Sequence, residues 1–90
     1  MFIYEISVDS KWWVSANDEF DAIEVFKDEL CASLPEVDQE SILEDLSIRR
    51  IYAKEASSIL GRNYFSEEMS IQEMFSVSPI PELLYTDFWE

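Results

Sequence analysis

Carboxylates are the main side chains in this sequence from which chemistry could be built. Twenty Asp and Glu stand against six Lys and Arg, and the chain has no histidine. Without histidine it lacks the commonest general base, the Ser-His and Cys-His nucleophile pairs and the usual zinc ligand. Paired carboxylates act as acid and base in glycoside hydrolysis, but 90 residues leave little room for a sugar cleft. We therefore expect no catalytic residue and no enzyme.

Cofactor and metal sites are not expected either. The single glycine, Gly61, cannot build a glycine-rich phosphate loop or a dinucleotide fingerprint. The single cysteine, Cys31, cannot build a thiolate metal site. The segment Asp38-Gln39-Glu40 lacks the spacing and the central glycine of an EF-hand calcium loop. The carboxylates are therefore expected to act in binding.

The acids are concentrated where cations are scarce. Lys27 is the one cation within residues 12–48, whereas exposed helices usually mix signs and gain ion pairs of a few tenths of a kcal/mol each. This imbalance indicates a negative surface used for binding. Eight carboxylates form the candidate site: Asp21, Glu24, Asp28, Glu36, Asp38, Glu40, Glu44 and Asp45.

A row of carboxylates on a helix has a spacing close to that of DNA phosphates. Helix positions three or four apart lie about 5–6 Å from each other, and the rise per nucleotide along one DNA strand is about 3.4 Å. Such a row fits the Lys and Arg sites of a nucleic-acid-binding protein. The alternative is a solvated helix face whose charge only confers solubility, and salt-independent binding would favour that alternative.

The formal net charge of −14 restricts the possible partners. It argues against direct binding of nucleic acid or an anionic membrane, because phosphate binding depends on Lys and Arg. It favours a basic protein, with fast and salt-sensitive association. We find no signal peptide and no window near the roughly 18 apolar residues that span a bilayer, so we expect a cytoplasmic protein. A homo-oligomer is compatible with this composition.

The pattern of apolar residues predicts one α+β domain over residues 1–90. Alternating β-branched and aromatic residues predict strands over 2–8, 12–16, 47–52 and 83–89. We expect an antiparallel sheet of three or four strands, with one long amphipathic helix on a face and one or two short helices. A short helix is predicted within 36–45, and Ser70 with Glu73 fits a capping box before a second one over 71–77. Residues 53–70 are ambiguous, and one interpretation is a short helix over 53–60 with Gly61 as its C-cap.

The long helix is predicted to begin after an N-cap at Asn17 and to end before Pro35. Its apolar residues recur at three- and four-residue steps: Phe20, Ile23, Phe26, Leu30 and Leu34. Three of the candidate acids fall on the opposite side of the helical wheel: Asp21, Glu24 and Asp28. The helix would therefore present these acids to solvent while its apolar stripe packs on the sheet.

Two pairs of adjacent residues lie on predicted strands: the tryptophans Trp12 and Trp13, and the arginines Arg49 and Arg50. Trp12 and Trp13 must point to opposite faces of the sheet. One packs beneath the helix, while the other is either buried on the far face or exposed as an interface hot spot. Of Arg49 and Arg50, one is expected to pair with nearby acids. The pair is not expected to form a basic site against so acidic a background.

The arrangement at the two ends of the chain resembles that of many small phage-encoded proteins. A short strand is followed by Trp13-Val14-Ser15-Ala16 and an acidic capped helix with Ala22-Ile23, and the close is Leu83-Leu84-Tyr85-Thr86-Asp87-Phe88-Trp89. Proteins of this size and charge include anti-CRISPR proteins and anti-restriction DNA mimics, which bind the basic nucleic-acid channel of a host nuclease complex. The resemblance implies an inhibitor of this kind, and no functional residue transfers from it.

These observations lead to one expectation and two alternatives. The expectation is a phage-type inhibitor, such as an anti-CRISPR, that blocks a basic nucleic-acid-binding protein with the eight candidate carboxylates in place of phosphates. The first alternative is an immunity or antitoxin protein that neutralises a basic nuclease toxin. The second is an acidic structural or regulatory protein without mimicry.

Overall fold

The computed structural model describes residues 1–8, 10–33, 44–62 and 67–87. Within them the elements follow in this order: β1 (Phe2–Ser7), β2 (Lys11–Ala16), α1 (Glu19–Ser33), β3 (Ser47–Ile51), α3 (Ala53–Ser58), β4 (Leu60–Arg62), β5 (Glu68–Ser70), α4 (Ile71–Ser76) and β6 (Glu82–Thr86). The predicted α+β class is confirmed. The predicted helix within 36–45 falls almost wholly on residues outside those described.

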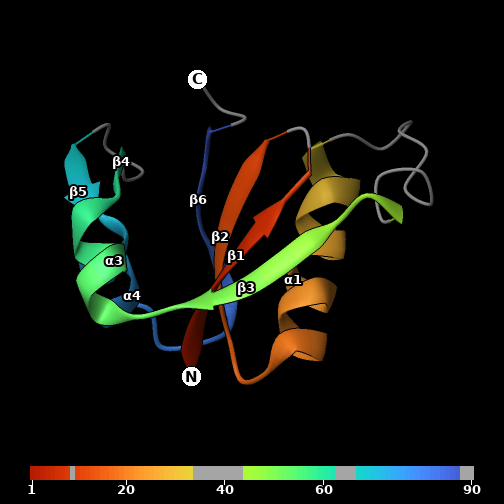
Figure 1. Cartoon of the computed structure of the whole chain (residues 1–90), viewed down its shortest axis with the longest axis horizontal. Helices are drawn as coiled ribbons and strands as arrows, with labels where there is room; N and C mark the ends of the chain where they lie inside the picture. Colours follow the sequence, from red (N-terminus) through yellow and green to blue (C-terminus); the bar gives the residue numbers. More distant parts are fainter. Residues whose placement is uncertain (9, 34–43, 63–66, 88–90) are drawn as a thin grey trace.

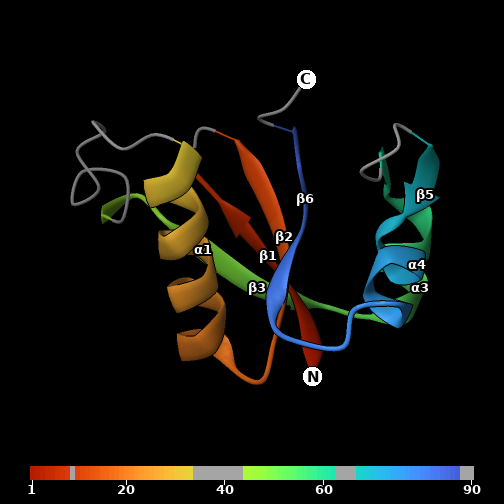
Figure 2. The same ribbon diagram turned by 180° about the vertical axis from the view of Figure 1, so that it is seen from behind.

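A four-stranded antiparallel sheet lies at the centre, in the order β3-β1-β2-β6. Helix α1 covers one face of this sheet, while α3, α4 and the two-stranded β4–β5 ladder cover the other (Figures 1 and 2). The predicted helix on one face is therefore correct, and the second layer is additional. It is formed by residues 53–62 and 67–76, from the stretch whose structure the sequence left ambiguous and the capped helix that follows.

Alternating residues of β1 and β2 build the core beneath α1. The buried side chains on this face are Tyr4, Ile6, Trp12, Val14, Ala16, Ala22, Phe26 and Leu30. The indole of Trp12 meets the ring of Phe26 edge-on, with ring centroids 5.4 Å apart and an interplanar angle of 74°. Edge-to-face geometry is one of the two preferred arrangements of aromatic pairs, and this contact fixes which side of α1 faces the sheet.

The intervening residues of β1 and β2 contribute to a second core on the opposite face of the sheet. Trp13 stacks on Tyr85, with centroids 5.9 Å apart, and the remaining buried members are Ile3, Ile51, Ala56, Ile71 and Met74. Trp13 is only 6% exposed. The two tryptophans do point to opposite faces, but the option of an exposed indole is wrong because the second layer covers Trp13.

The start of α1 differs from the prediction in two details. Asp18 caps the helix in place of Asn17, since its Oδ1 accepts a hydrogen bond of 2.8 Å from the backbone N–H of Asp21. Phe20 does not belong to the buried stripe and is 83% exposed. It lies six residues before Phe26, which places it about 120° around the helix from that buried ring.

The second layer corrects the expected role of Gly61. Helix α3 ends with Ile59 as C-cap, and Gly61 lies within β4. A Cβ atom at Gly61 would lie 2.7 Å from Cγ of the buried Tyr85 ring. The glycine is therefore needed for the close approach of β4 to the sheet. The predicted cap of α4 is confirmed, because Ser70 Oγ accepts a hydrogen bond from the Glu73 N–H at 3.1 Å.

Candidate functional site

The outer face of α1 carries two of the candidate acids. Glu24 and Asp28 are exposed and lie four residues apart, so they are neighbours along the helix surface. The neighbouring cation Lys27 has its Nζ 3.9 Å from Glu24 Oε1, and the Glu24 side chain is 70% exposed. An exposed pair of this kind is worth about 0–1 kcal/mol, so Lys27 leaves Glu24 accessible to a partner.

Asp21 belongs to the same helix but has a structural task. Its Oδ2 accepts hydrogen bonds from the backbone N–H of Asn17 at 3.0 Å and from Asn17 Nδ2 at 3.2 Å. Together with the Asp18 cap, these bonds fix how the chain leaves β2 and enters α1. Asp21 is half-buried, so it presents less of its carboxylate to solvent than Glu24 or Asp28.

Glu44 and Asp45 lie in the segment that leads into β3, and both are exposed. This segment lies on the α1 side of the sheet in both views (Figures 1 and 2). Leu46, which follows it, packs against the core beneath α1. The structure therefore places Asp21, Glu24, Asp28, Glu44 and Asp45 on one side of the molecule. Glu36, Asp38 and Glu40 lie outside the described residues.

Phe20 was missed as a candidate binding residue. It lies four residues before Glu24, so its exposed ring and that carboxylate share a helix face. A helical wheel centred on Ala22, Phe26 and Leu30 would have placed Phe20 outside the stripe. We refer to Phe20, Glu24 and Asp28 together as the outer face of α1.

Arg49 forms ion pairs with Glu5 and Glu55 on the side of the sheet opposite α1. One of the two arginines was predicted to pair with nearby acids. The Nε of Arg49 donates to Oε2 of Glu5 at 2.7 Å and its Nη1 to Oε1 of Glu55 at 3.0 Å. Glu5 is 4% exposed and also accepts from the Trp13 indole N–H at 3.2 Å. The guanidinium compensates this buried charge, so Arg49 does not neutralise the outer face of α1.

Arg49 also sets the titration of Glu55, which gives a test of this pairing. Hydrogen bonding to the guanidinium lowers the pKa of Glu55 from its ordinary value of 4.5. A lowered pKa means that this contribution to stability is complete above pH 4.5 and is lost as the pH falls through the pKa of the folded protein. In Arg49→Gln, we expect the pKa of Glu55 to rise toward 4.5, measured by NMR titration of its carboxyl carbon. An unchanged pKa of Glu55 in this variant would contradict the pairing.

Within residues 1–8, 10–33, 44–62 and 67–87, no three His, Cys, Asp or Glu side chains are grouped so as to hold a metal ion. None of the helices described there has the length and apolar character needed to cross a membrane. Comparison with protein-family models, curated proteins and solved structures finds no match to this chain. The arguments about function therefore rest on the geometry and charge of the chain itself.

Proposed function

We propose that this protein is a phage-type inhibitor that binds a basic, nucleic-acid-binding protein and blocks its nucleic-acid site. Carboxylates on the α1 side of the molecule take the place of phosphates and meet Lys and Arg side chains of the partner. The inhibitor performs no chemistry and acts by occupying the site. A host nuclease complex is the expected target, in line with the resemblance to anti-CRISPR and anti-restriction proteins.

The observation that carries the proposal is the exposure of Glu24 and Asp28 on α1, a helix whose sequence contains Lys27 as its one cation. Lys27 makes one long, exposed ion pair, and Arg49 is bound to Glu5 and Glu55. Glu44 and Asp45 extend the negative charge beyond α1. Such a surface attracts a cationic groove at long range, which raises the association rate at low salt.

Phe20 adds an apolar contact to the proposed surface. A row of carboxylates alone would give attraction that is easily screened by salt, whereas an aromatic ring buried at the interface adds a contact that salt does not weaken. Exposed aromatic residues beside charged ones are common anchors in protein interfaces. We therefore expect the partner to have an apolar depression bordered by Lys or Arg.

Phe20→Ala tests this anchor. Because the ring is 83% exposed, we expect the free energy of unfolding to change by less than about 0.5 kcal/mol. Loss of an interface anchor costs about 2 kcal/mol or more, so capture of basic proteins from a bacterial extract should weaken about 30-fold. To measure this, the immobilised protein is incubated with the extract, bound proteins are eluted with salt, and their amounts are determined by mass spectrometry.

Val77→Ala provides the matched control, since Val77 is also exposed, at 73%, and lies just after α4 in the layer opposite α1. It should capture the same proteins as the unsubstituted chain. Equal capture by Phe20→Ala would remove Phe20 from the binding surface, and loss of capture by both variants would point to general stickiness of exposed apolar groups.

A further inference from the structure

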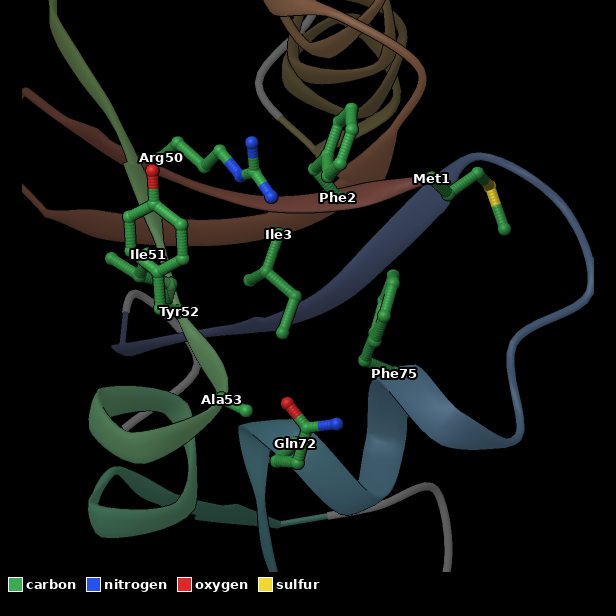
Figure 3. Close-up of a pocket in the computed structure, with 9 residues that line it drawn as sticks. All are labelled: Met1, Phe2, Ile3, Arg50, Ile51, Tyr52, Ala53, Gln72 and Phe75. Atoms are coloured by element: carbon green, nitrogen blue, oxygen red, sulfur yellow. The ribbon is translucent and has the colours of Figure 1, made fainter.

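A pocket at the end of the sheet opposite to the β1–β2 turn is independent of the acidic surface. Its volume is about 340 Å³, and none of the five candidate carboxylates that the structure describes lines it. Its wall residues come from the start of β1, the end of β3, the start of α3 and from α4: Met1, Phe2, Ile3, Arg50, Ile51, Tyr52, Ala53, Gln72 and Phe75. Figure 3 shows Ile3 between the Arg50–Phe2 side and the α4 side chains Gln72 and Phe75.

Arg50 gives this pocket its chemical character. The guanidinium carbon lies 3.7 Å from the ring centroid of Phe2 and 4.6 Å from that of Tyr52. Contacts of this kind hold the planar group in place and leave the N–H groups at its edge available. Arg50 forms no ion pair with any described carboxylate, although the chain carries a net charge of −14.

The remaining lining is mostly apolar, with one neutral amide. Ile3 and Ile51 are buried, and Phe75 of α4 is half-buried. Gln72 is half-buried, and its side chain forms no hydrogen bond with another described residue. Sites for small molecules have volumes of about 300–1,000 Å³ and combine apolar walls with a few polar groups that orient the ligand. The pocket has these properties at the lower end of that size range.

We propose that this pocket binds a small apolar monocarboxylate. The guanidinium of Arg50 pairs with the carboxylate, and the apolar body of the ligand lies over Ile3 and extends toward Gln72 and Phe75 of α4. A cationic ligand is disfavoured because Arg50 already occupies the faces of Phe2 and Tyr52. A phosphate dianion would carry two charges into a strongly negative molecule with one local cation, so a single negative charge fits best.

The test uses 3-phenylpropionate as the probe and 3-phenylpropanol as its neutral counterpart, each titrated into the full chain and followed by ¹H–¹⁵N NMR. We expect shifts of amides in β1, the end of β3 and α4, and an affinity for the carboxylate about tenfold or more above that for the alcohol, because charge-assisted hydrogen bonds are the stronger ones. Equal affinity for both probes, tighter binding of the amine 3-phenylpropylamine, or shifts away from the pocket would overturn the proposal.

Two variants, each with a matched control, distinguish the contribution of the Arg50 charge to binding from that of the pocket volume. Arg50→Gln should remove the preference for the carboxylate, while Arg62→Gln, which removes the same charge from an exposed position of β4, should keep it. Ala53→Phe should fill the pocket and abolish binding of both probes, while Ser57→Phe, on the exposed surface of α3 outside the lining, should not. Retained carboxylate preference in Arg50→Gln would contradict the assigned role of Arg50.

Discussion

Conversion of three exposed acids on the α1 side to their amides is expected to weaken capture of the basic partner about 100-fold. The variant combines Glu24→Gln, Asp28→Asn and Glu44→Gln. Each lost charge pair is worth about 1 kcal/mol at an interface edge, and three of them amount to about 3 kcal/mol. The measurement is the affinity of the captured protein for the immobilised variant, at low and at high salt.

Folding of this triple variant should not suffer. All three side chains are exposed, and removal of like charges relieves repulsion within a molecule whose net charge is −14. The matched control removes the same number of charges from the opposite layer by Glu67→Gln, Glu68→Gln and Glu73→Gln, three exposed positions on or next to β5 and α4. If both variants lose affinity equally, net charge rather than the α1 side governs binding.

Phe26→Ala should have the largest effect on stability. Phe26 is fully buried and packs edge-on against Trp12, so its truncation leaves a cavity between α1 and the sheet. Such substitutions cost about 3–5 kcal/mol, a large part of the roughly 5–15 kcal/mol that stabilises a domain. We expect a fall in Tm of about 15–30 °C, measured by thermal unfolding with far-UV circular dichroism.

Phe20→Ala is the internal comparison for this prediction, because it makes the same chemical change on the same helix. With the ring exposed, its stability should stay within about 0.5 kcal/mol of that of the unsubstituted chain. Similar losses from the two substitutions would mean that α1 is rotated relative to the structure described above.

Local patterns in the sequence were sufficient to predict the central sheet and its helix. Alternation of apolar residues located β1 and β2, and the adjacency of Trp12 and Trp13 placed them on opposite faces. The Ser70–Glu73 spacing identified the start of α4 because the cap is a contact between near neighbours. Each of these features depends on residues only a few positions apart.

Features that depend on distant contacts were not predictable in the same way. Trp13 is covered because Tyr85 stacks on it and side chains of α3 and α4 pack in the same core. Gly61 is required by the ring of Tyr85 rather than by the end of a helix. The exposure of Phe20 follows from the rotation of α1 about its axis, which Phe26 and Trp12 set. An apolar stripe that includes Phe20 is therefore rotated about the helix axis relative to the face that α1 buries.

For the candidate site, the sequence placed Glu24 and Asp28 on the helix face directed away from the sheet, where the structure has them exposed. The sequence did not predict that Asp21 accepts hydrogen bonds from Asn17. Asn17 and Asp18 are both good N-caps, so the pattern does not show that Asp18 takes the cap and that Asn17 donates to Asp21 instead. The role of these acids in binding stays a prediction, as do the positions of Glu36, Asp38 and Glu40.

Competition with duplex DNA tests the central claim most directly. Proteins captured from a bacterial extract by the immobilised chain are washed with increasing concentrations of a duplex oligonucleotide at constant ionic strength. If the carboxylates occupy a nucleic-acid site, the duplex should release the captured protein in proportion to that protein's own affinity for DNA. A captured protein that binds DNA and the immobilised chain at the same time, with no release at saturating duplex, would contradict the account.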